Sequence, residues 1–190
     1  MEFVIIIIGA IFVNNIVLNQ FLGICPFLGV STRLSTATGM SAAVTFVMTL
    51  ATLVTYLIHT LLLIPLKIEF LKTVSFILVI AALVQMVELI LKKISQPLYQ
   101  ALGVYLPLIT TNCAIMGVAL LVIKEKYNLV ESVVYAIATS IGFGLALIIF
   151  AGIRERLELY DIPEGMKGAP IALITAGLLS LAFLGFSGMV

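Results

Sequence analysis

The chain has 190 residues, of which 63% are hydrophobic and 10% are charged, and its formal net charge is +1. Soluble domains carry about 25% charged residues, so this composition excludes a soluble globular protein, and the small net charge provides no basic surface for nucleic acid. A mean hydropathy of +1.29 predicts an all-α integral membrane protein.

Six long uncharged runs follow one another along the chain. A helix needs about 20 apolar residues to cross the hydrocarbon, and the third run reaches this length because its apolar pattern continues past Glu88. The sequence therefore predicts six transmembrane helices with short polar joints, in one membrane domain (1–190). The runs are 3–32, 34–66, 73–87, 94–123, 132–153 and 168–190.

The first run starts at the N-terminus with MEFVIIIIGAIFV. It has Glu2 where a signal peptide carries Lys or Arg, and no small-residue cleavage site follows. We expect a retained helix rather than a signal peptide.

The basic residues predict the orientation. Positive residues favour the cytoplasmic loops, and the more basic side is the one opposite the N-terminus, so we expect both termini outside the cytoplasm. The N-terminal side holds Lys67, Lys72, Lys124 and Lys126, and the opposite side holds Arg33, Lys92, Lys93, Arg154, Arg156 and Lys167.

The two cysteines lie in similar segments of the first and fourth runs. Cys25 begins CPFLGV and Cys113 begins CAIMGV, so both read C-x-x-x-G-V, 88 residues apart. Three helices per half is an odd number, so the second half enters the membrane from the opposite side. We expect two inverted three-helix repeats, 1–93 and 94–190, an arrangement that builds sites near the bilayer midplane.

The first and fourth runs are each 30 residues long and rich in Pro, Gly and amide residues. Proline removes a backbone donor, glycine permits the resulting turn, and Asn or Thr can satisfy the freed backbone groups. We expect each of these helices to be interrupted in mid-membrane. The residues are Asn14, Asn15, Asn19, Gln20, Gly23, Pro26 and Gly29 in the first run, and Gly103, Pro107, Thr110, Thr111, Asn112 and Gly117 in the fourth.

Three roles are open for Cys25 and Cys113: small buried side chains, a disulfide, or metal ligands that approach each other across the repeat axis. A cysteine-held iron–sulfur cluster needs four ligands, and the chain has two Cys and one His. Cluster binding would therefore require a partner chain.

The segments VNNIVLNQFLGICPFLGVSTRL, LPLITTNCAIMGVALL and FLGFSGMV carry a resemblance over the whole length. The chain resembles the membrane subunits shared by the Rnf ion-translocating ferredoxin:NAD oxidoreductases and the sodium-pumping NADH:quinone oxidoreductases. The segment CPFLGVS favours the A subunits of Rnf complexes within this family.

The resemblance implies a subunit of a bacterial or archaeal inner membrane that pairs with a homologous subunit, RnfE, in opposite orientation. The other subunits would be B, C, D and G. It also implies one [2Fe–2S] cluster shared by the two homologues, with Cys25 and Cys113 as this chain's iron ligands. Electrons would pass through the cluster, coupled to transport of Na⁺ or H⁺.

No catalytic residue is expected in this chain. It has no P-loop, no C-x-x-C, no H-E-x-x-H and no G-x-G-x-x-G after a predicted strand, and STATGMS does not match the flavin-attachment segment of related complexes. We expect no bound NAD or flavin, and an oxidoreductase and translocase activity that belongs to the whole complex.

Other polar residues have structural interpretations. We expect His59, the only histidine, to lie near the membrane interface, and Glu88 and Lys92 to pair at i,i+4 spacing. Arg154 and Glu158 have the same spacing and predict a paired cytoplasmic loop that contacts another subunit. Thr110, Thr111 and Asn112 have two interpretations: they satisfy the helix break, or they tune the potential of a cluster, as main-chain amides of the breaks could also do, by hydrogen bonds to its sulfurs.

Two other functions compete with the redox role. A small secondary transporter would use the same broken helices for a solute or ion, but it leaves both cysteines unexplained. A purely structural scaffold is supported only by the lack of catalytic motifs, and it predicts that substitution of either cysteine is silent.

Overall fold

A computed structural model describes residues 2–66, 69–94, 106–160 and 163–185. Within these ranges the chain forms helices and turns and no strand. The all-α prediction is confirmed for this part of the chain. Gly103 of the predicted second break and Lys67 of the charge count lie outside the described residues.

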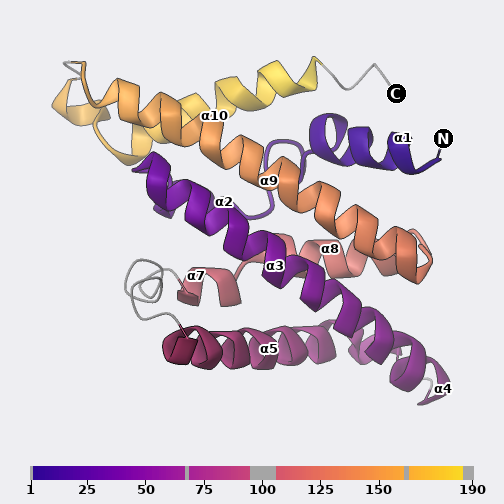
Figure 1. Ribbon diagram of the computed structural model, residues 1–190. Helices are drawn as coiled ribbons and strands as arrows, with labels where there is room; N and C mark the ends of the chain where they lie inside the picture. Colours follow the sequence, from indigo (N-terminus) through magenta and orange to yellow (C-terminus); the bar gives the residue numbers. More distant parts are fainter. Residues whose placement is uncertain (1, 67–68, 95–105, 161–162, 186–190) are drawn as a thin grey trace.

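The helices follow one another from the N-terminus to the C-terminus as shown in Figure 1. Helices η1 and η2 are π-helical continuations of α1 and α3, and η3 and η4 are single 3₁₀ turns. The bounds are α1 (Glu2–Ile8), η1 (Gly9–Val13), α2 (Ile24–Gly29), α3 (Leu34–Ile58), η2 (His59–Leu63), α4 (Ile64–Leu66), η3 (Glu69–Leu71), α5 (Lys72–Ile94), α7 (Leu106–Thr110), α8 (Cys113–Lys124), α9 (Leu129–Leu157), η4 (Glu164–Met166) and α10 (Ala169–Leu184).

Among the described residues, four stretches are long and apolar enough to cross a membrane, which agrees with a multi-pass membrane protein. The first and last predicted spans give shorter apolar helices, because the first run leaves the helix after Val13 and α10 has 16 residues. The four stretches are Leu34–Leu63, Lys72–Ile90, Pro107–Lys124 and Leu129–Leu157, and the shorter helices are Phe3–Val13 and Ala169–Leu184.

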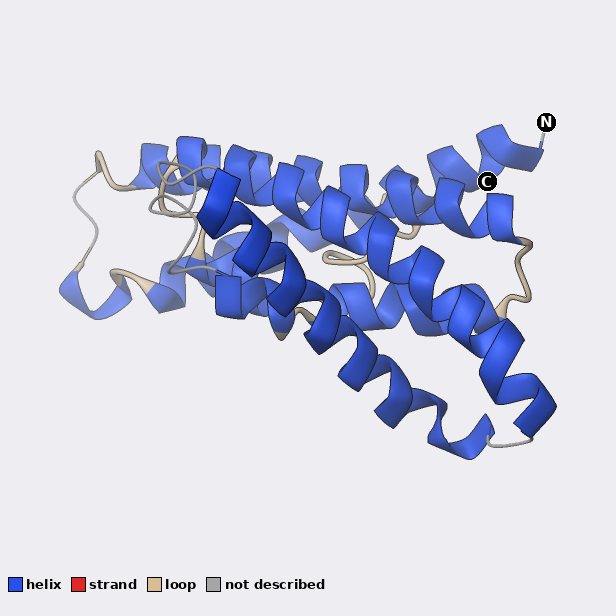
Figure 2. Cartoon of the chain, turned by 60° about the horizontal axis from the view of Figure 1, so that its bottom comes forward, coloured by secondary structure: helices blue, strands red, loops and turns tan. Residues whose placement is uncertain are grey.

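The two longest helices, α3 and α9, pack against each other and form the centre of the molecule (Figure 1). Helices α5, α7 and α8 lie on one side of this pair, while α1, η1 and α10 contact α9. Seen from another direction, most helices run lengthwise through one bundle (Figure 2). The first interruption contacts α9 through Asn15, and the second lies between α7 and α8, both of which contact α5.

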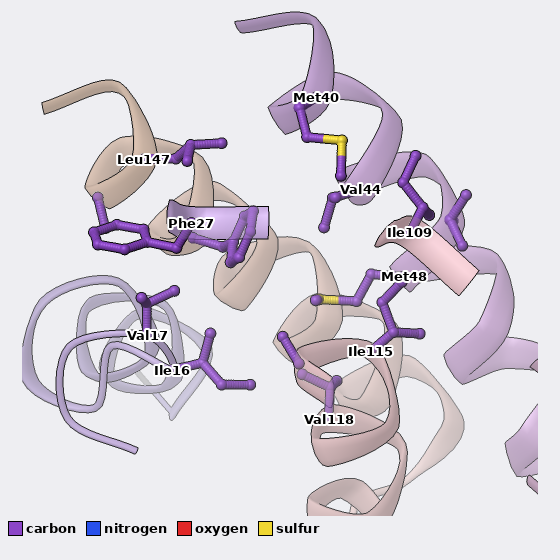
Figure 3. Packing of buried hydrophobic residues seen from close by; sticks show 14 of the residues in the cluster. Ile16, Val17, Phe27, Met40, Val44, Met48, Ile109, Ile115, Val118 and Leu147 are labelled. Carbon is purple, nitrogen blue, oxygen red and sulfur yellow. The ribbon is translucent and has the colours of Figure 1, made fainter. Parts of the chain in front are cut away.

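The core joins the segments around both interruptions. Side chains from α3, α7, α8 and the first interruption meet in one cluster (Figure 3). Phe27 of α2 stacks on Phe150 of α9, with ring centroids 4.3 Å apart. Since lipid tails are as apolar as these side chains, close van der Waals packing holds such helices together. This packing fixes short α2 against the long helix α9.

A candidate cofactor site between two helix breaks

The first break covers residues 14–23, after the π-helical turn η1. Asn15 is 0% exposed, and its Nδ2 donates to the carbonyls of Ile11 (3.1 Å) and Gly142 (2.9 Å). Its Oδ1 accepts from the N–H of Val17 at 3.1 Å. The prediction that an amide side chain satisfies freed backbone groups is confirmed here, and the partner Gly142 lies on α9.

The second break consists of Thr111 and Asn112, between α7 and α8. Asn112 is the N-cap of α8, and its Oδ1 accepts from the N–H of Ala114 at 3.0 Å. Thr111 Oγ1 donates to the carbonyl of Pro107 at 2.9 Å. Asn112 is 3% exposed, and its Nδ2 has no partner among the described residues. Local bonds therefore hold this break.

The two breaks meet at a sulfur atom. The N–H of Gly23, the N-cap residue of α2, donates to Cys113 Sγ with an N···S distance of 2.9 Å. Cys113 is the first residue of α8, and Cys25 follows Gly23 by two residues. Helices α2 and α7 are also in contact. The structure thus brings together the two segments in which the sequence places the cysteines.

Both cysteines lie in the first turn of a half-helix rather than in the non-helical joint itself. Neither forms a disulfide, and Cys25 is exposed while Cys113 is partly buried. A disulfide or a buried apolar role therefore does not describe Cys25. No group of three or more His, Cys, Asp and Glu side chains gathers as a metal site in the described part of the chain. Two thiols from this chain make half of a four-cysteine donor set.

Five of the predicted break residues lie in the flanking helices rather than in the breaks: Pro26 and Gly29 in α2, Pro107 and Thr110 in α7, and Gly117 in α8. Gly117 lies inside its helix and has another role. A Cβ on Gly117 would lie 2.5 Å from Leu22 Cδ1. The glycine makes room for a side chain of the first break, and this contact was not visible from helix-breaking propensity.

Arg154 of α9 binds the far end of α2. Its Nη1 donates to the carbonyl of Leu28 and to Ser31 Oγ, both at 2.8 Å. The sequence predicts Glu158 as the partner of Arg154, whereas the hydrogen bonds of Arg154 in the structure go to the end of α2. The last carbonyls of a helix lack intrahelical partners and carry partial negative charge, so they compete successfully for the guanidinium. This contact ties the Cys25 half-helix to α9, and sequence reasoning missed it.

A cavity of about 500 Å³ lies beside the first break. Its polar lining includes Asn14 and Gln20 of the break, together with Glu125 and Tyr127 from the loop between α8 and α9. Burial raises the pKa of Tyr127 above its usual value, and the charges of Glu125 and Glu131 raise it further.

His59 and Glu88 lie apart from this site. His59 begins η2 and makes an edge contact with the Phe76 ring, with centroids 6.4 Å apart. This contact agrees with the structural role expected for His59. Glu88 is half-buried on α5.

Comparison with known proteins identifies the family. Residues 3–190 match the family described as "Rnf-Nqr subunit, membrane protein". The chain is 59% identical to the A subunit of the Na(+)-translocating ferredoxin:NAD(+) oxidoreductase complex of Acetobacterium woodii. It is 58% and 54% identical to the A subunits of the ion-translocating oxidoreductase complexes of Pseudoalteromonas atlantica and Vibrio cholerae. Each alignment covers 100% of this chain and 98% of the relative. The chain belongs to the Rnf–Nqr family of membrane protein subunits.

Proposed function

We propose that this chain is the A subunit of an Rnf-type ion-translocating ferredoxin:NAD oxidoreductase complex. Family membership and full-length similarity to the A subunits of such complexes support this proposal. In this function the chain relays electrons through the membrane and does no substrate chemistry alone. The oxidoreductase and translocase activities belong to the assembled complex.

The observation that carries the redox part of the proposal is the hydrogen bond between Gly23 and Cys113. It places the start of the Cys25 half-helix beside the start of the Cys113 half-helix, so two thiols come from adjacent first turns. A [2Fe–2S] cluster needs four cysteine ligands, and the exposed Cys25 thiol is accessible to a second chain. We assign Cys25 and Cys113 as half of the ligand set and a homologous protein, RnfE, as the source of the other half.

A bound [2Fe–2S] cluster would supply one-electron transfer within a hydrocarbon layer about 30 Å thick, which is too wide for efficient transfer without an intermediate centre. The chain's own residues hold the ligands in place. The positive end of α8 lies at Cys113 and favours negative charge on its sulfur. Asn15 and Arg154 bind the first break and α2 to α9.

The proposed membrane arrangement is six helices in two inverted repeats, 1–93 and 94–190, with both termini outside the cytoplasm. The breaks at 14–23 and 111–112 support it, because each half contains a break immediately before its C-x-x-x-G-V segment. Coupling to Na⁺ or H⁺ would follow from movement of the paired half-helices at the interface with RnfE. Structures of oxidised and reduced complex with identical half-helix positions would contradict this coupling scheme.

Substitution of each cysteine tests the redox role. We expect Cys25→Ser or Cys113→Ser to remove the iron, acid-labile sulfide and electron paramagnetic resonance (EPR) signal of the shared cluster from purified complex, while the variant chain remains in the membrane. Gly29→Ala is a matched control near the site, because its Cβ would only make an ordinary 3.5 Å contact with Leu108. Retention of all three signals in both cysteine variants would overturn the redox assignment.

A secondary transporter is the competing function, and the cavity beside the first break favours it. Its lining of Asn14, Gln20 and Glu125 could contact a solute or ion. The same cysteine variants distinguish the two functions, since a transporter without a redox centre would keep its transport and lose no iron signal.

A further inference from the structure

We propose that the main-chain amide of Gly23 raises the reduction potential of the shared cluster by donating a hydrogen bond to the Cys113 ligand sulfur. This inference rests on the proposed function, because it requires a cluster at Cys25 and Cys113. The inference assigns a positioning role to Gly23, which has no side chain. Gly23 acts through its main-chain N–H, which the first break places beside Cys113 Sγ.

The Gly23 amide is free for this role because of its place in the helix. The N–H groups of the first turn of a helix have no intrahelical partner. The carbonyl of Gly23 accepts from Phe27 in the first turn of α2, while its N–H points out of the helix to Cys113 Sγ at 2.9 Å. A backbone donor of the first half thus bonds a ligand of the second half.

Only glycine fits this position. Its φ is +82°, in the left-handed region that side chains disfavour. A Cβ would lie 2.8 Å from a ring carbon of Phe143 and 3.1 Å from the Cβ of Ala114. Both of these neighbours are 0% exposed, so neither can move into open space. The close packing fixes the amide against α8 and α9 and thereby fixes its distance from the sulfur.

The second sulfur of the chain is in a different environment. Cys25 accepts no hydrogen bond from the described residues, and it is exposed. The two ligands therefore differ, since only Cys113 has a backbone donor within the described part of the chain. Hydrogen bonds to ligand sulfur stabilise the more negative, reduced form and are one of the factors that set cluster potentials. The Gly23 amide should raise the potential.

Redox titration of Gly23→Ala tests the role. The potential shift equals the difference between the hydrogen-bond energies of the reduced and the oxidised cluster, and a tenfold change in this one-electron equilibrium is about 59 mV. In Gly23→Ala the clash of the Cβ with Phe143 and Ala114 moves the amide away from the sulfur. We expect the cluster of purified Gly23→Ala complex, followed by EPR, to have a lower potential, by up to about 59 mV. Gly29→Ala should keep the wild-type potential, because its Cβ fits.

A second measurement needs no substitution and so covers a Gly23→Ala variant that fails to assemble. In wild-type complex grown with ¹⁵N-glycine, pulsed EPR of the reduced cluster should detect a ¹⁵N coupling from an amide hydrogen-bonded to ligand sulfur. Absence of a glycine ¹⁵N coupling, or an unchanged potential in Gly23→Ala, would overturn the inference while leaving the cluster in place. Absence of any cluster from wild-type complex would instead refute the proposed function.

Discussion

The two helix breaks each precede a C-x-x-x-G-V motif, but they are built differently. The first is long (14–23) and is followed by the short α2, which ends at the glycine of the motif, Gly29. The second is short (111–112) and is followed by α8, which continues through Gly117 to Lys124. Equivalent motif positions thus have different structural roles in the two halves.

The difference lies in what holds each break. Asn15 binds the first break to α9 across 127 positions of sequence, whereas Asn112 caps the helix that directly follows it. The first break therefore depends on a distant helix, and the second depends on local chain geometry. The comparison shows that a repeated motif specifies where a helix is interrupted, while the surroundings decide how the interruption is stabilised.

The largest predicted effect is the difference in stability between alanine variants of Asn15 and Asn112. Asn15→Ala leaves the buried donors and acceptors that bond its amide unsatisfied, at about 1–3 kcal/mol each. We therefore expect the free energy of unfolding to fall by about 3 kcal/mol or more. Asn112→Ala removes one N-cap bond and should cost about 1 kcal/mol. The measurement is the unfolding temperature of this chain within detergent-solubilised complex. Equal losses for the two variants would contradict the comparison.

A second prediction concerns the helix against which the first break packs. In Gly142→Ala the Cβ would lie 3.1 Å from Ile11 Cα and 3.2 Å from the Ala10 carbonyl oxygen. Backbone atoms cannot move aside as a side-chain end can, so we expect a loss of about 1–3 kcal/mol. Gly152→Ala on the same helix meets nothing within 4 Å and should gain up to about 1 kcal/mol from helix propensity. An unfolding temperature as high in Gly142→Ala as in Gly152→Ala would show that the packing of η1 on α9, which leads into the first break, does not need this close contact.

A third prediction tests the far end of α2. Arg154→Gln should lower stability by about 1–2 kcal/mol, because the charged donor to Leu28 and Ser31 is lost. Arg156→Gln is the control, since Arg156 is exposed and surface charges contribute about 0–1 kcal/mol. Thermal unfolding of the two variant complexes checks this order, and a larger loss for Arg156→Gln would refute the anchoring role of Arg154.

The smallest predicted effect compares the two motif glycines. Gly117→Ala must displace the end of the Leu22 side chain, which can rotate, so we expect a net cost of about 1 kcal/mol. Gly29→Ala should be close to neutral. The same thermal unfolding measures both variants. If Gly29→Ala lowers stability as much as Gly117→Ala does, the two glycines are structurally equivalent.

Sequence alone determined the membrane class, the family and the neighbourhood of both breaks. These features depend on local properties: the hydropathy of each run, the backbone limits of Pro and Gly, and short motifs around Cys25 and Cys113. The role of amide and hydroxyl side chains in satisfying the breaks was predictable where it is local. Asn112 and Thr111, for example, form hydrogen bonds with groups no more than four residues away.

Only the tertiary structure decided which distant groups meet. The Gly23 amide reaches Cys113 across 90 positions, and Arg154 reaches Leu28 across 126. Local spacing predicted Glu158 as the partner of Arg154, whereas the structure shows Arg154 bonded to the Leu28 carbonyl and to Ser31 Oγ, which no spacing rule brings nearby. Such contacts depend on how α2, α8 and α9 pack, because a hydrogen bond in a membrane interior forms wherever packing leaves a donor and an acceptor together.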